Sequence, residues 1–135
     1  MQKLTKTGKS DAQLAVVEIR PNVRGGFGFD KRADQLLAGS FNEADVKYSH
    51  VARYSLCFTG GVTVEPVRAL IQELASKHKL ILAVGAEAQK HLCETKRTQD
   101  QYAGSLTWNK RINTWVLPSY HPSVVYVGDK KTLNS

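Results

Sequence analysis

Short apolar runs that alternate with helical patterns constrain the fold of this chain more than any other feature. The clearest run, Leu80–Val84, is continuously apolar and passes through Gly85 directly into a segment of helical composition at 86–93. The runs at 14–19 and 51–58 are also β-prone, and a helical pattern follows each of them. Alternating strands and helices favour a parallel sheet with helices on both faces.

Two longer segments carry the helical patterns between these runs. Asp30 is placed to cap a helix that extends to about Phe41, and Thr63 is placed to cap the next helix. The second helix has apolar residues at the spacing of one buried face: Val67, Leu70, Ile71 and Leu74. Both helices should therefore pack against the sheet.

The end of the chain supplies the remaining strands. A run at 115–117 predicts a buried strand, and a turn at 109–111 joins it to a possible hairpin partner at 105–108. We therefore expect a single three-layer α/β/α domain over residues 14–135, with a small four-stranded, mainly parallel sheet. Residues 1–13 are polar and basic and are predicted to form a flexible N-terminus.

Composition narrows the classes of function. The 135-residue chain has a formal net charge of +7, which favours a polyanionic partner such as DNA. Cys57 and Cys93 are the two cysteines, and without a CxxC pair they cannot build a zinc ribbon or an iron–sulfur site. We expect both to be buried free thiols and no metal or cofactor to be used. The N-terminus lacks the apolar core of a signal peptide, so a cytoplasmic monomer that contacts no membrane is expected.

The loop after the last predicted strand has the features of a binding or catalytic site. Pro118 should end that strand abruptly, and Pro122 fixes a second backbone angle four residues later. Ser119, Tyr120 and His121 lie between the two prolines, so the loop is stiff and holds an imidazole in one place. The carboxyl edge of an open α/β sheet is where ligands bind.

A second loop should reach the same edge of the sheet. Glu18 lies near the end of the first predicted strand, and the segment after it is rich in glycine and contains Phe27 and Phe29. Glycines give this loop the backbone freedom for close approach to a ligand. The loop and the histidine segment should therefore converge.

These segments together resemble the uracil-DNA glycosylase superfamily. The sequences at 80–88 and 117–123 resemble its strand–glycine–helix element and its His-Pro-Ser loop. The segment at 17–21 corresponds to its first motif, and 26–37 resembles its Gly-x-Pro-Phe segment and the following helix. The resemblance spans roughly residues 14–127, and it implies base excision from DNA without a metal or cofactor.

The resemblance also implies roles for individual residues. His121 would donate a hydrogen bond to the leaving base, and Glu18 would stabilise the positive sugar or orient water. Phe27, Phe29, Ser55 and Tyr120 would hold a base flipped out of the duplex. The candidate DNA contacts are Ser119, Ser123, Val125 and Tyr126, together with four basic residues in turns that we expect to neighbour the same edge of the sheet: Lys110, Arg111, Lys130 and Lys131.

Simpler interpretations stay open beside these roles. In one, Glu18 is an ordinary strand-end residue paired with Arg20; in another, one of the two phenylalanines anchors its loop in the core. The same fold could also serve as a catalytically inactive DNA-binding or protein-interaction module, with or without a partner protein that completes the site. An enzyme acting on free nucleosides is disfavoured, because no GxGxxG segment follows a strand.

Overall fold

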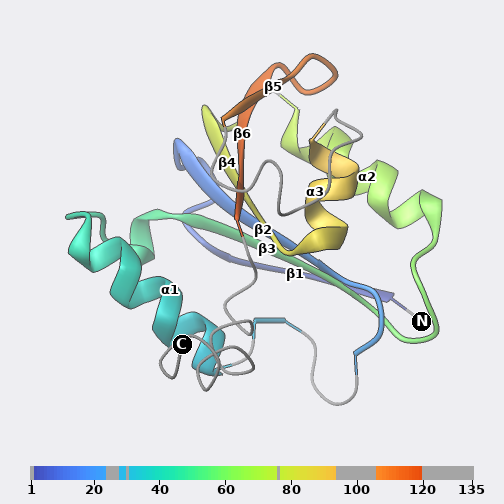
Figure 1. Ribbon diagram of the computed structural model, residues 1–135, viewed down its shortest axis with the longest axis horizontal. Coiled ribbons are helices and arrows are strands. Elements are labelled where there is room, and N and C mark those ends of the chain that lie inside the picture. Colours follow the sequence, from blue (N-terminus) through green and yellow to red (C-terminus); the bar gives the residue numbers. More distant parts are fainter. Residues whose placement is uncertain (1, 24–27, 30, 76, 94–105, 120–135) are drawn as a thin grey trace, which may run out of the picture.

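The computed structural model describes residues 2–23, 28–29, 31–75, 77–93 and 106–119, and the structural statements below concern this part of the chain. Its centre is a six-stranded mixed sheet in the order β1-β3-β2-β4-β6-β5 (Figure 1). The strands are β1 (Gln2–Gly8), β2 (Leu14–Arg20), β3 (Ala52–Phe58), β4 (Leu80–Val84), β5 (Thr107–Asn109) and β6 (Thr114–Ser119). The four middle strands are parallel to one another, and β1 and β5 are antiparallel strands at the two edges.

Helices cover both faces of this sheet. They are α1 (Lys31–Glu43), α2 (Val64–Leu74) and α3 (Ala86–Leu92), with a 3-10 turn η1 (Tyr48–His50) before β3. Figure 1 shows α2 and α3 on one side of the sheet and α1 on the other. The larger core lies under α2 and α3, where Val67, Leu70 and Leu74 of α2 are buried, as their spacing predicted. A smaller core joins Leu37 of α1 to Val16 and Val84 of the sheet.

The predicted α/β class is confirmed, but the prediction of four mainly parallel strands is wrong. Antiparallel strands β1 and β5 flank the parallel group and make the sheet mixed. The short strand β5 belongs to the possible hairpin noted in the sequence. It pairs with β6 through only three residues, Thr107–Asn109.

The expectation of a flexible arm at residues 1–13 is also wrong. Gln2–Gly8 pairs along its whole length with β3 as β1, and Leu4 packs against the larger core. The segment has one large apolar residue in seven, so its periodicity gives almost no strand signal. It is an edge strand because β3 offers a free row of backbone donors and acceptors, which pairing satisfies.

The abrupt end predicted at Pro118 is not observed. Strand β6 continues to Ser119, and Pro118 pairs in register with Ala83 of β4. Strand β5 pairs with β6 only as far as Val116. Beyond that residue β6 has a strand neighbour on one side in the described chain, so a proline without an N–H can be accommodated there.

The remaining described helices and strands have bounds close to those predicted, but Thr63 makes no side-chain capping hydrogen bond at the start of α2. Both cysteines are buried and free of disulfide bonds. Burial raises the pKa of the Cys93 thiol, which keeps it protonated near neutral pH. Within the described residues, no helix is both long and apolar enough to cross a membrane.

Candidate functional site

The strand order reverses direction at one point of the sheet, and a crevice is expected at the carboxyl ends of the strands there. From β2 the chain crosses to β3 on one side, and from its neighbour β4 the chain crosses toward β5 and β6 on the other side. Connections that leave neighbouring strands in opposite directions open a space outside their carboxyl ends, and ligands of α/β proteins bind there. The ends of β2 and β4 therefore mark the candidate site.

A row of side chains in register crosses the sheet close to this edge. Ser55 of β3 pairs with Glu18 of β2, Glu18 pairs with Val84 of β4, and Val84 pairs with Ser119 of β6. Paired residues in a sheet project to the same face, and Val84 belongs to the core beneath α1. The row therefore lies on the α1 face, with polar residues at three of its four positions.

Glu18 is the buried acid of this row. Its residue is only 1% exposed, and the Ser55 hydroxyl donates a hydrogen bond of 2.5 Å to Glu18 Oε1. A carboxyl group removed from water is costly unless hydrogen bonds replace its hydration. Ser55 supplies that compensation from the adjacent strand and also lies 3.3 Å from Cys57 Sγ. Two residues singled out separately in the sequence thus form one contact.

The end of β6 is fixed in place by α3. The Ser119 carbonyl accepts hydrogen bonds from the Gly85 backbone N–H at 2.9 Å and from Gln89 Nε2 at 2.5 Å. Gln89 is fully buried. Sequence reasoning missed Gln89, since a glutamine in a helix gives no sign that it will bind a strand end. The last residue of β6 consequently has a defined position at the carboxyl edge of the sheet.

The loop after β2 is only partly described, and its visible residues act as anchors. Phe29 is half-buried and packs against the core beneath α1, which matches the anchoring alternative rather than base stacking. Arg20 Nη1 donates a hydrogen bond of 3.2 Å to the Gly28 carbonyl. Gly28 has a φ of +93°, a conformation that side-chain-bearing residues rarely adopt. The loop is thus tied to the end of β2.

Several predicted site residues lie outside the described part of the chain. They are Phe27, Tyr120, His121, Ser123, Val125, Tyr126, Lys130 and Lys131. Their roles stay predictions. Among the described residues, no group of three or more His, Cys, Asp or Glu side chains is arranged to hold a metal ion.

Lys110 and Arg111 do not lie at the carboxyl edge, so the expectation that their turn neighbours it is wrong. They occupy the turn between β5 and β6, at the start of β6. Because β6 is parallel to β2 and β4, its start lies at the opposite, amino edge of the sheet. The structure therefore separates these two cations from Glu18.

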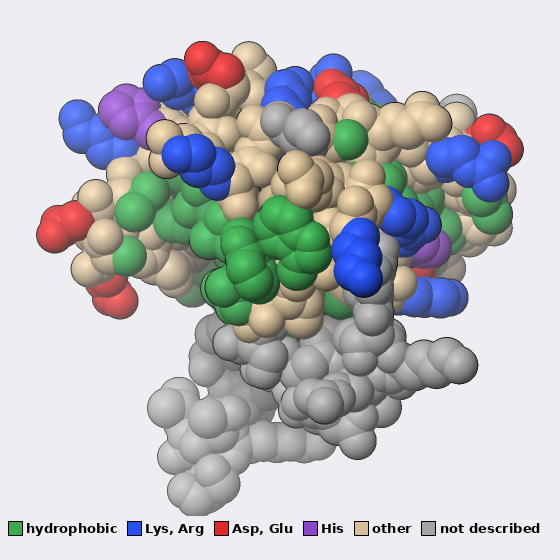
Figure 2. All heavy atoms as spheres, turned by 90° about the horizontal axis from the view of Figure 1, so that it is seen from above, with side chains coloured by type: hydrophobic (Ala, Val, Ile, Leu, Met, Phe, Trp, Pro, Cys, Tyr) green, Lys and Arg blue, Asp and Glu red, His purple; other side chains and the backbone are tan. Residues whose placement is uncertain are grey.

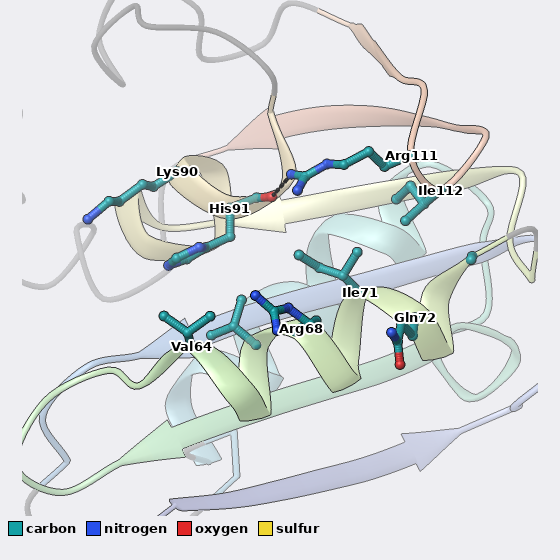
Figure 3. Close-up of a pocket in the computed structure, with 10 residues that line it drawn as sticks. Val64, Arg68, Ile71, Gln72, Lys90, His91, Arg111 and Ile112 are labelled. Carbon is teal, nitrogen blue, oxygen red and sulfur yellow. Dashed lines mark hydrogen bonds between the residues drawn. The ribbon is translucent and has the colours of Figure 1, made fainter.

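Arg111 borders a groove on the α2–α3 face instead. The groove has a volume of about 430 Å³, with an apolar floor that includes Ile71 and Ile112. Figure 3 shows side chains of α2 directed toward α3 and the turn that carries Arg111. Arg111 Nη2 donates to the His91 carbonyl at 3.4 Å. This groove and the Glu18 row are on opposite faces of the sheet.

The sequence was compared with protein-family models and with curated proteins. No family model matches the sequence. A search of curated proteins finds no match either.

Proposed function

We propose that this chain is a DNA glycosylase that hydrolyses the N-glycosidic bond of uracil or a modified pyrimidine in DNA. The observation that carries the proposal is the buried Glu18 carboxyl, in register across β4 with Ser119, which lies two residues before His121. Strands β2 and β6 each lie one strand from β4, so about 10 Å separates their backbones. The described strand ends therefore hold Glu18 and Ser119 at a spacing comparable to the size of a nucleotide.

The chemistry needs few protein groups. Positive charge develops on the sugar while the departing base becomes negative. A carboxylate beside the sugar stabilises the cation or orients the attacking water, which is the role proposed for Glu18. A donor aimed at the base stabilises the anion, which is the role proposed for His121. No step calls for a metal or a redox cofactor.

The charge of the chain supports DNA as the substrate. A net charge of +7 attracts a polyanion and speeds encounter with it. We propose that the protein acts on DNA as a cytoplasmic monomer. Because Glu18 is almost completely buried, catalysis would require the DNA-bound state to bring water or the sugar against its carboxyl group.

A second candidate is a DNA-binding module without catalysis. One observation favours it: the Glu18 carboxyl is buried and already accepts a hydrogen bond from Ser55. A catalytic carboxylate must contact the reacting sugar or water. In this alternative Glu18 and Ser55 form a buried polar contact that fixes the register of β2 and β3.

Oligonucleotides containing uracil, hydroxymethyluracil or other modified pyrimidines test the proposal, with alkali used to reveal abasic sites. We expect cleavage of at least one substrate. His121→Ala should slow single-turnover cleavage by about 100-fold or more, because it removes a donor that acts on the leaving base. His50→Ala is the matched control, since His50 is exposed on η1.

The outcomes separate the two candidates. Salt-sensitive DNA binding with no abasic product from any substrate would establish the non-catalytic alternative. Cleavage that His121→Ala leaves unchanged would remove His121 from the mechanism. Glu18→Gln tests the second role, and it should reduce the cleavage rate without reducing DNA affinity.

A further inference from the structure

Two exposed tryptophans stand together on the hairpin at the edge of the sheet. Trp108 of β5 and Trp115 of β6 are direct cross-strand partners and are 40% and 44% exposed. Their rings meet edge to face, with centroids 5.1 Å apart and planes at 69°. They are the two tryptophans of the chain. Large aromatic side chains left in solvent side by side contribute little to a core and commonly mark a binding surface.

A hollow of about 470 Å³ lies beside this tryptophan pair at the amino edge of the sheet. The pair forms part of its wall, together with the exposed lysines Lys77 and Lys79 from the segment before β4. Asp11 is the one acidic residue among its described lining residues. Figure 2 looks from above Figure 1 onto the side that carries β5 and β6, and it shows hydrophobic side chains gathered among Lys and Arg side chains.

Buried polar contacts hold the hairpin in place. Asn109 Nδ2 donates to the Leu92 carbonyl at 2.7 Å, and Asn109 Oδ1 accepts from the Arg111 and Ile112 backbone N–H groups at 2.9 and 3.3 Å. The Thr114 hydroxyl lies 3.0 Å from the carbonyls of both His78 and Ile112. The two aromatic rings are therefore mounted on a backbone that is fixed before any ligand binds.

His78 lies between the two lysines and ties their backbone segment to the sheet. Its Nδ1 lies 2.6 Å from the Ala12 carbonyl, and its Nε2 lies 2.8 Å from the Tyr54 hydroxyl. The Lys79 backbone N–H donates to the Gln13 carbonyl at 2.8 Å. The backbone on either side of His78 is thus held in place, and it carries two lysines that line the hollow beside the tryptophan pair.

We propose that the tryptophan pair and these lysines form a binding surface for unpaired bases of single-stranded nucleic acid. A base stacks on an exposed tryptophan face, while Lys77 and Lys79 neutralise the adjoining phosphates. Single-strand binding proteins combine these two elements, aromatic stacking surfaces and a positively charged groove. Charge selects this occupant over a neutral sugar or an apolar protein segment, because the hollow carries more cations than anions and the chain is at +7.

This surface is separate from the proposed glycosylase site. Trp115 and Ser119 are at opposite ends of β6, so about 13 Å of strand lies between them. Binding at the tryptophan pair needs neither Glu18 nor His121. The inference therefore does not depend on the proposed activity.

Intrinsic fluorescence provides a direct test, because every tryptophan in the protein belongs to the proposed surface. Titration with single-stranded oligothymidine of about 10 nucleotides should quench the emission. Trp108→Ala and Trp115→Ala each leave one reporter and should each weaken affinity roughly 10- to 100-fold, since stacking on that ring is lost. Trp115→Phe should retain part of the affinity because the phenyl ring still stacks.

Matched controls identify the contribution of each group. Val64→Ala removes another exposed apolar side chain, 65% exposed on α2, and should leave affinity unchanged. A Lys77→Gln and Lys79→Gln double variant should reduce the dependence of affinity on salt, and Lys47→Gln in an exposed loop should not. In the His121→Ala variant, oligothymidine should quench the tryptophan emission as it does in the unmodified protein. This result would separate the tryptophan surface from the proposed catalytic site.

Three results would overturn the inference. The first is oligothymidine binding that leaves tryptophan emission unchanged. The second is quenching of equal strength and affinity by a blunt DNA duplex, whose bases are already stacked. The third is an emission change on dilution without nucleic acid, accompanied by a change in oligomeric state, since a second copy would then cover the pair.

Discussion

The two ends of the four parallel strands are built on opposite principles. At the carboxyl end, Glu18 is buried and its carboxyl accepts a hydrogen bond from Ser55. At the amino end, Trp108 and Trp115 remain exposed beside two lysines. One end places a polar group in the interior and the other places apolar groups in solvent.

Each arrangement makes the folded state less stable than a buried apolar side chain or an exposed polar one would at the same position. Burying a carboxyl group is unfavourable without compensating hydrogen bonds, and exposing indole rings forgoes hydrophobic stabilisation. A buried acid beside the strand ends suits chemistry on a ligand held there. Exposed rings with cations suit reversible contact with a charged, planar ligand. The proposed chemistry and the proposed single-strand binding would thus lie at different edges of the sheet.

The largest stability effect should come from the buried amide that holds the amino end. Asn109→Ala removes one donor contact and two acceptor contacts, and it leaves backbone groups without partners. We expect a loss of about 2–4 kcal/mol in the free energy of unfolding, measured by urea denaturation. Asn42→Ala, at an exposed position on α1, should change it by less than about 0.5 kcal/mol. Equal effects would show that the hairpin is not held by this side chain.

Removing a hydrogen bond at the carboxyl end should lower the free energy of unfolding by a smaller amount. Ser55→Ala leaves the buried Glu18 carboxyl without its serine donor and should cost about 1–3 kcal/mol. Chemical denaturation measures this, with Ser49→Ala on the exposed turn η1 as the control. A loss no greater than that of Ser49→Ala would show that Ser55 does not compensate for the burial of Glu18. The two ends would then no longer contrast in the way described.

The smallest effect should be a pH dependence that originates at the amino end. Burial lowers the pKa of His78 below its usual value near 6.5. In the neutral ring, Nδ1–H donates to the Ala12 carbonyl and Nε2 accepts from the Tyr54 hydroxyl. As the pH falls below 6.5, the unfolded chain binds a proton that the folded chain resists, so stability decreases toward acid.

Thermal unfolding across about one pH unit on either side of 6.5 measures this dependence. His78→Gln should flatten the acid side of the curve, because it removes the group whose pKa differs between the folded and unfolded states. Well above pH 6.5 His78 is neutral in both the folded and the unfolded state, so the pH dependence that it causes disappears. An unchanged slope in His78→Gln would assign the acid sensitivity to other groups.

Parts of the fold were readable from local pattern alone. The strand Leu80–Val84 has the predicted bounds, and the buried positions of α2 follow the spacing of Val67, Leu70 and Leu74. Strand β1 was not readable, because Leu4 is its one large apolar residue and its partner β3 lies far along the chain. For the candidate site, the sequence indicated Glu18 and Ser55 as separate candidates, but it did not predict the hydrogen bond between them.

The sequence by itself determined where most strands and helices form, since hydrophobic periodicity acts between residues only a few positions apart. It also determined the basic charge and the residues available for chemistry. The tertiary structure alone decided which of these residues meet. Ser55 reaches Glu18 across 37 positions because β3 pairs with β2 in one register, and the hairpin register makes Trp108 face Trp115. Strand pairing also decided where Arg111 lies. Because β6 runs parallel to β4, the turn before β6, which contains Arg111, lies at the amino edge of the sheet.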